Sequence, residues 1–314
     1  MSQFPSFQKV SVLATSSALS PNLKSEVEGY LSSHELKISY LLNPYKGYGN
    51  DEHLFAAHSA DERLRAMEGF LTLNETGLFL AARGGAGAYD LLSPQLLSRM
   101  EVALKGKPGK ILCGYSDFTL LLSVFESLES LTLIHGPALL GFRAELPLEV
   151  RDQNLQSLLD VLRGGTLLVP DSEIEAVFPD RGNVEGEVFG GNLSVLCSLL
   201  GTPYFPKISK KRILLLEDVG EAPHKIHRHL SHLRAASVFS NVSGVLLGSF
   251  YGCHHPEKKP PSTLDVIKRF FETEAIPVFR TESIGHGPIN RSIPLYRKVQ
   301  LSEEGLHLDS PLRL

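Results

Sequence analysis

Short apolar runs alternate with segments of helical periodicity through the first half of the chain. The runs predict strands over residues 9–15, 36–42, 77–82, 110–113 and 132–134, and the periodic segments predict helices over 20–31, 59–71 and 117–128. This alternation is typical of a parallel sheet covered by helices. In such sheets functional residues gather at the carboxyl ends of strands, where residues 83–85 and 114–117 lie.

The second half of the chain has its own pattern. Residues 144–189 are polar and irregular, which indicates a domain boundary. Beyond them the pattern predicts helices over 193–200 and 226–233 and strands over 212–216 and 242–247. We therefore expect an N-terminal α/β domain at 1–150, a linker at 151–180 and a C-terminal domain at 181–314.

Composition narrows the class of protein. The 314 residues suffice for about two domains. The 31 basic and 35 acidic residues give a net charge of −4, which offers no basic surface for nucleic acid. Three widely spaced cysteines, Cys113, Cys197 and Cys253, provide no disulfide framework and favour a reducing compartment. Since the start of the chain lacks the features of a signal peptide and no apolar run reaches membrane-helix length, we expect a soluble cytoplasmic protein.

Ser116 stands between a predicted strand and a predicted helix, and Gly114 permits a sharp turn before it. That geometry exposes a serine hydroxyl and directs helix N-terminal amides at the group it attacks, as in a nucleophile elbow. The full elbow pattern has a glycine two residues after the serine, where this chain has Phe118. Ser116 is therefore either a nucleophile or the cap of an ordinary helix.

A serine nucleophile needs a base, and the base needs an orienting acid. Glu217, Asp218 and Glu221 follow a predicted buried strand, so they either supply that acid or cap the next helix. His286 lies between two glycines that leave its imidazole unobstructed, which suits a general base as well as a plain loop residue. The order serine, acid, histidine is that of the α/β-hydrolases.

Three further clusters are open to more than one interpretation. The turn at 83–87 contains three glycines, so it could contribute to an oxyanion hole, hold a phosphate or simply turn the chain. The histidines at 224, 227, 229 and 232 lack the i, i+4 spacing of a zinc helix. Adjacent side chains such as Cys253, His254 and His255 rarely converge on one ion, so we expect no metal site.

Six segments in register resemble the LD-carboxypeptidases, serine peptidases that trim murein tetrapeptides. Their order and spacing match over most of the chain. The segments are RGGAG at 83–87, GYSD at 114–117, HGP at 135–137, GGNLSVLCSLLGTPYFP at 190–206, LLLEDVGEAPHKIHRHLSHL at 214–233 and IGHGPIN at 284–290.

The resemblance implies a Rossmann-like N-terminal domain with a parallel sheet, a smaller C-terminal β/α domain and a site between them. It implies a triad of Ser116, Glu217 and His286. That triad would remove the terminal D-alanine from murein tetrapeptides through an acyl-enzyme, at the bond to the L-centre of meso-diaminopimelate. It further implies a cytoplasmic enzyme of peptidoglycan recycling that needs no metal or cofactor and is commonly a homodimer.

The same resemblance suggests residues around the triad. The amides of Asp117 and Gly85 would hold the oxyanion. Arg83 is a candidate for binding the terminal carboxylate of the substrate, although it could equally be a structural partner of Glu217 or Asp117. Asn192 is a further candidate for contact with the substrate.

Some features leave the assignment incomplete. His135 is the main rival of His286 as base, but the rigid turn after it suits a pocket wall. Family members usually have an aromatic residue at position 86 and often a basic one near 89–90, where this chain has Ala86, Tyr89 and Asp90. These differences leave the pocket shape and the substrate preference open.

Two other functions compete with this one. A relative of the microcin-immunity type would use the same triad on aminoacyl or peptidyl nucleotides, but the chain has no tryptophan to stack on a nucleobase. A non-catalytic ligand-binding protein would not need serine, glutamate and histidine together.

Overall fold

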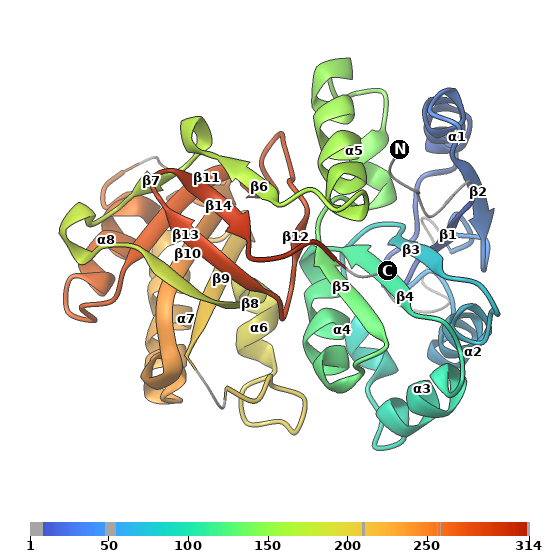
Figure 1. Ribbon diagram of the computed structural model, residues 1–314, viewed down its shortest axis with the longest axis horizontal. Helices are drawn as coiled ribbons and strands as arrows, with labels where there is room; N and C mark the ends of the chain where they lie inside the picture. Colours follow the sequence, from blue (N-terminus) through green and yellow to red (C-terminus); the bar gives the residue numbers. More distant parts are fainter. Residues whose placement is uncertain (1–8, 48–54, 209–210, 256, 258, 313–314) are drawn as a thin grey trace.

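The computed structural model describes residues 9–47, 55–208, 211–255, 257 and 259–312. Within them the strands form two sheets that lie side by side (Figure 1). The strand order is β12-β5-β4-β3-β1-β2 in the first sheet and β6-β14-β13-β8-β9-β10-β11-β7 in the second. No helix in these ranges is both long enough and apolar enough to cross a bilayer.

The first sheet is the predicted parallel sheet with helices on both faces. Its parallel strands are β1 (Lys9–Leu13), β2 (Lys37–Tyr40), β3 (Gly77–Ala81), β4 (Lys110–Gly114) and β5 (Leu131–His135). Helices α1 (Lys24–Ser33) and α5 (Leu148–Leu162) cover one face, and α2 (Ala60–Leu71), α3 (Leu96–Leu104) and α4 (Thr119–Val124) cover the other (Figure 1). The predicted strands are confirmed to within about two residues at each end, and Ser59 and Glu62 form a capping box at the start of α2.

The second sheet has a parallel centre and antiparallel edges. The parallel strands are β8 (Val184–Asn192), β9 (Arg212–Val219), β10 (Val242–Tyr251) and β11 (Val278–Gly285). The antiparallel strands are β6 (Leu167–Pro170), β7 (Glu175–Ala176), β13 (Lys298–Ser302) and β14 (Gly305–Leu308). Apolar side chains of α6 (Leu193–Ser198), α7 (Pro223–Ala235) and α8 (Thr263–Phe271) form one buried cluster with β8, β9 and β10.

Residues 151–180, expected to be a linker, contain most of α5 together with β6 and β7. These strands were not predicted because both are short and lie at the two edges of the second sheet, where no continuous apolar run is needed. Helix α5 buries only a narrow stripe that includes Leu155, Leu158 and Val161, so its sequence is polar overall.

The chain returns from the second sheet to the first through the segment after β11. There β12 (Ile293–Pro294) pairs antiparallel with β5, and Ile293 lies opposite His135. The amide of Asn290 donates to the side chain of Asn154 at 2.8 Å, and that of Ser292 donates to Ser157 at 2.8 Å. This crossing holds residues 286–292 against the carboxyl end of the first sheet.

Candidate active site

Ser116 lies on a left-handed turn between a strand and a helix. Strand β4 ends at Gly114, a short 3-10 helix covers Ser116–Phe118, and α4 follows. Ser116 has φ of 62°, a region that residues with a Cβ atom seldom occupy. Such strain persists only where the surrounding structure enforces it, and it is the backbone geometry of a nucleophile elbow.

The close approach that an elbow requires comes from the neighbouring strand. A Cβ atom added to Gly84, in the turn after β3, would lie 2.5 Å from Oγ of Ser116. Phe118, which replaces the expected second glycine, is fully buried and stacks on Phe79 with ring centroids 5.8 Å apart. The departure at position 118 therefore leaves the Ser116 turn intact.

Hydrogen bonds connect the glycine turn to Asp117 in the elbow and to Ser17 in the segment after β1. The amide of Ala88 donates to Oδ2 of Asp117 at 2.9 Å, and the amide of Ala86 donates to Oγ of Ser17 at 3.1 Å. Gly85 has φ of 104°, and a Cβ atom there would overlap Ser17. The amide nitrogen of Asp117 would lie 3.3 Å from a Cβ atom on Gly84, so this amide faces the same crowded space as the Ser116 hydroxyl.

Arg63 of α2 contacts the turn, although no pattern in the sequence points to this residue. Its guanidinium is buried and donates to the carbonyl oxygens of Thr15 and Gly87. It also pairs with Asp90 at 3.5 Å. The hydroxyl of Tyr89 donates to the carbonyl of Ser198 in α6 at 2.5 Å. Asp90 and Tyr89, two of the three residues that depart from the family pattern, thus join the turn to α2 and to α6.

Glu217 and His286 meet at the carboxyl end of the second sheet. Nδ1 of His286 lies 2.7 Å from Oε2 of Glu217, and the carboxylate is completely buried. A Cβ atom on Gly285 would lie 2.5 Å from the same oxygen, so only glycine permits this approach. The glycine before His286 therefore makes room for the carboxylate as well as for the imidazole.

A second imidazole lies on the other side of the same carboxylate. Nε2 of His135 lies 3.7 Å from Oε1 of Glu217, which is an ion-pair distance and too long for a direct hydrogen bond. Burial raises the pKa of Glu217, but His135 and His286 outweigh it and lower the pKa to about 2. The side chain of His135 is 0% exposed, whereas Pro137, in the rigid turn after it, lines a pocket beside His286.

Tyr115 connects the elbow to His286. Its ring lies 4.8 Å from the imidazole of His286 and 6.2 Å from that of His135, measured between centroids. Among the described residues the Ser116 hydroxyl has no hydrogen-bond partner. The structure thus joins Glu217 to His286 and packs the neighbour of Ser116 against that imidazole, while the Ser116–His286 hydrogen bond is not made.

A small pocket opens beside His286, and we call it the His286 pocket. It is lined by Tyr115, Pro137, Gly141, Arg143, Leu146, Asn154, Gly285, His286, Gly287, Pro288 and Asn290. Burial and the charge of Glu217 raise the pKa of Tyr115 to about 12, although Arg143 and Arg83 both act to lower it.

Arg83 does not line this pocket. Its Nη1 lies 3.5 Å from the carbonyl oxygen of Ala18, and its buried Nε has no hydrogen-bond partner among the described residues. Within the same residues it makes no ion pair with Glu217 or Asp117, the two structural partners considered for it.

Asn192 and Asp218 form a separate internal network. Asn192 caps α6 by accepting from the amide of Val195, and its Nδ2 donates to Asp218 at 3.1 Å. The hydroxyl of Ser194 donates to Asp218 at 2.6 Å. Asn192 is 4% exposed and is engaged at both ends of its amide, so its side chain serves the cap and Asp218.

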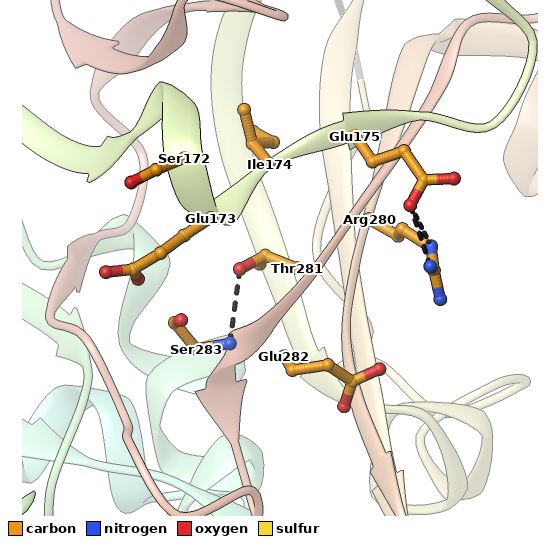
Figure 2. A pocket seen from close by; sticks show the side chains of 8 residues that line it. All are labelled: Ser172, Glu173, Ile174, Glu175, Arg280, Thr281, Glu282 and Ser283. Carbon is orange, nitrogen blue, oxygen red and sulfur yellow. Dashed lines mark hydrogen bonds and ion pairs between the residues drawn. The ribbon is translucent and has the colours of Figure 1, made fainter.

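A second pocket follows β11 away from the triad residues. Figure 2 shows it between residues 172–175 and 280–283, with Glu175 bound to Arg280 through hydrogen bonds of 2.9 and 2.7 Å. Glu173 is held in the same way by Arg291, at 2.6 and 2.5 Å. None of the predicted site residues lines this pocket.

The histidine-rich helix α7 exposes His224 and His227 to solvent, while Nε2 of His229 lies 3.5 Å from the hydroxyl of Ser194. Cys253 is buried below Glu221, whose amide donates to its sulfur at 3.4 Å. In the described part of the chain, no group of three or more histidine, cysteine or acidic side chains is arranged to hold a metal ion.

Two models of known protein families match this chain, one in each half. Residues 10–136 match the LD-carboxypeptidase N-terminal domain, and residues 185–301 match the LD-carboxypeptidase C-terminal domain. A murein tetrapeptide carboxypeptidase from Pseudomonas aeruginosa is 29% identical over 252 residues, which cover 79% of this chain and 80% of that protein.

Two solved structures share the fold. MccF in complex with glutamyl sulfamoyl guanosine superposes with a TM-score of 0.81 at 20% identity and covers 97% of both chains. A muramoyltetrapeptide carboxypeptidase from Oxalobacter formigenes superposes with a TM-score of 0.75 at 21% identity, covering 97% of this chain and 100% of that one. With both of its halves matched, the chain belongs to the LD-carboxypeptidase family, whose members are serine-type carboxypeptidases.

Proposed function

We propose that Ser116, His286 and Glu217 form a serine–histidine–glutamate triad. The observation that carries this proposal is the 2.7 Å contact between His286 and a buried Glu217. Because the pKa of Glu217 is about 2, its carboxylate is ionised at neutral pH and can only accept a hydrogen bond. Nδ1 of His286 therefore carries the proton, and Nε2 is left free to take one from Ser116.

The reaction proceeds in two halves. As Ser116 attacks the terminal peptide carbonyl, His286 accepts the hydroxyl proton and then passes it to the departing amine. The backbone amides of Asp117 and Gly85 donate hydrogen bonds to the oxyanion. A strong donor of this kind stabilises the transition state by about 3 kcal/mol. Water then hydrolyses the ester on Ser116 with His286 again as base.

The reaction requires Ser116 and His286 to approach each other. They come from different sheets, and the segment after His286 joins those sheets through β12 and β5. In unliganded enzymes catalytic hydrogen bonds are often long and tighten on substrate binding. A small closure of the two halves over the substrate would form the missing hydrogen bond.

The substrate we propose is a murein tetrapeptide, cleaved between the L-centre of meso-diaminopimelate and the terminal D-alanine. The name of the Pseudomonas aeruginosa relative supports this choice. A cytoplasmic role in peptidoglycan recycling and a homodimeric assembly complete the proposal.

The direct test is mass spectrometry of the purified protein incubated with the disaccharide-free tetrapeptide. We expect the loss of one alanine, and no loss with the Ser116→Ala variant. A parallel incubation offers glutamyl sulfamoyl guanosine, the ligand of MccF in one of the similar structures. Cleavage of that compound with no release of alanine from the tetrapeptide would contradict the proposal. So would tight binding of the tetrapeptide without turnover.

A further inference from the structure

The His286 pocket is lined by a guanidinium group without a carboxylate partner and by a side-chain amide nitrogen without an acceptor. Among the described residues, Arg143 makes no ion pair, and its Nη1 donates only to the carbonyl of Leu140 in its own turn, at 2.9 Å. Asn290 is 4% exposed, and its Nδ2 is buried without a partner. A buried donor left without an acceptor costs about 1–3 kcal/mol, so Nδ2 of Asn290 favours a ligand with an acceptor oxygen. The charge of Arg143, which lines the same pocket, favours a ligand that is an anion.

The orientation of the Asn290 side chain is fixed by its other end. Its Oδ1 accepts from the amide of Gly285 at 2.8 Å, so Nδ2 is the end left without a partner. Asn154, the other amide lining the pocket, has a partner at each end, because it donates to the carbonyl of Gly141 at 3.2 Å and accepts from the amide of Asn290 at 2.8 Å. The pocket therefore presents positive charge and donors to a ligand.

The chemistry of the triad determines which part of a substrate reaches this pocket. On the proposed function, His286 hands its proton to the departing nitrogen, so the leaving residue lies beside the imidazole. In a terminal residue the free carboxylate is two bonds from that nitrogen. A group that binds the carboxylate must therefore line the same small space as His286, as Arg143 and Asn290 do.

We infer that Arg143 and Asn290 form the subsite for the leaving residue, in which they bind the free carboxylate of the terminal D-amino acid. Guanidinium and amide N–H groups suit the two oxygens of a carboxylate. The cavity measures about 60 Å³, room for about four to six water-sized groups, which is comparable to one alanine residue. Pro137, Gly141 and Leu146 supply an apolar wall for its methyl group. The subsite would thus explain why the enzyme removes a single small terminal residue.

This assignment rests on the proposed function, and it replaces Arg83 as the receptor of the terminal carboxylate. Arg83 follows β3 and does not line the pocket with His286. Its Nη1 donates to the carbonyl of Ala18, and its Nε is buried, so neither group lies in the space of the leaving residue.

The test compares three substrates with the same acyl portion: the tetrapeptide, its C-terminal amide, and the methyl ester of the tripeptide. The wild-type protein should prefer the free acid over the amide by about 10- to 100-fold in kcat/KM, the range expected for charge-assisted hydrogen bonds. Arg143→Gln should lose that preference while hydrolysing the methyl ester within about twofold of wild type. Arg143→Lys should restore part of it.

Asn290→Asp provides a second variant, because it keeps the acceptor for Gly285 and replaces the free donor with an oxygen. It should also reduce the preference for the free acid. Arg65→Gln on α2, whose side chain is 65% exposed, is the matched control and should behave as wild type.

Two results would overturn the assignment: an equal loss on all three substrates in Arg143→Gln, or a preference that disappears in Arg83→Gln and survives in Arg143→Gln. Failure of the proposed function looks different, because the wild-type protein itself would then release no D-alanine from the tetrapeptide. That result would remove the basis of the subsite as well.

Discussion

Glu217 accepts a 2.7 Å hydrogen bond from Nδ1 of His286 although the carboxylate is completely buried. A buried carboxylate is costly unless charged or polar partners compensate for its lost hydration. Here the compensation comes from two imidazoles, and it keeps the pKa of Glu217 at about 2. The residue is therefore a permanent anion that fixes the tautomer of His286.

The three acids after the buried strand should differ sharply in their effect on catalysis. We expect Glu217→Gln to lower kcat/KM by about 10⁴-fold, because the amide supports the wrong imidazole tautomer. Asp218→Asn disturbs only the Asn192 and Ser194 network, and Glu221→Gln removes an ion pair with Lys225, so both should cost far less. Steady-state assays of the three variants compare them directly. Equal losses would mean that the wrong carboxylate has been assigned.

The lowered pKa of Glu217 also predicts a pH-dependent stability. An ordinary glutamate titrates near 4.3. The folded pKa is lower, so the stabilisation is fully present above about pH 4.3 and is lost as the pH falls toward about 2. We expect the difference in unfolding free energy between wild type and Glu217→Gln to shrink by about 3 kcal/mol between pH 6 and pH 2.

Denaturant titrations at a series of pH values measure this difference. Glu101→Gln, on the exposed surface of α3, is the matched control and should show no such change. A difference that stays constant with pH would show that Glu217 is not held as an anion.

His135 should act through Glu217 and not through the substrate. Its side chain is sealed from solvent beside Oε1 of Glu217. We expect His135→Gln to lower kcat by about 10- to 100-fold, because a misplaced carboxylate misaligns the base, while KM stays within about twofold. His34→Gln, directly after α1, serves as the control. A raised KM with unchanged kcat would support the pocket-wall interpretation.

The left-handed conformation of Ser116 makes a prediction about stability. With φ of 62°, alanine at this position keeps the strain of a Cβ atom, whereas glycine relieves it. We expect both variants to be inactive and Ser116→Gly to be more stable than Ser116→Ala by about 0.5–1 kcal/mol, after the entropy of glycine is counted.

The same pair of substitutions at Ser98, on the exposed side of α3, should show the opposite order, since alanine favours a helix over glycine by about 1 kcal/mol. Thermal or denaturant unfolding of the four variants measures both differences. If glycine were no better than alanine at 116, the turn would not be left-handed in the folded protein.

Much of the first sheet could be predicted from the sequence because its strands are buried on both faces and appear as continuous apolar runs. The edge strands β6, β7 and β12 could not be, since each is short and is defined by its partner rather than by its own composition. The 117–128 segment was predicted as one helix, whereas the structure has α4 flanked by two short 3-10 helices.

The candidate site likewise contains residues that the sequence predicts and residues that only the structure reveals. The motifs identified Ser116, Glu217 and His286, but their surroundings depend on contacts between distant segments. Gly84 supplies the close approach that the elbow pattern assigns to position 118, and Arg143 lies in none of the motifs. Only the folded chain brings such residues together, because their positions in the sequence carry no periodic or spacing signal.

The central claim is that Ser116 becomes covalently acylated by the peptide. Acid quenching of the protein during turnover of the tetrapeptide, followed by peptide mass mapping, measures this directly. The account predicts an adduct of the tripeptide on the peptide that contains Ser116, with neither adduct nor turnover in Ser116→Ala. Release of D-alanine by Ser116→Ala at the wild-type rate, with no adduct on Ser116 in the wild-type protein, would contradict it.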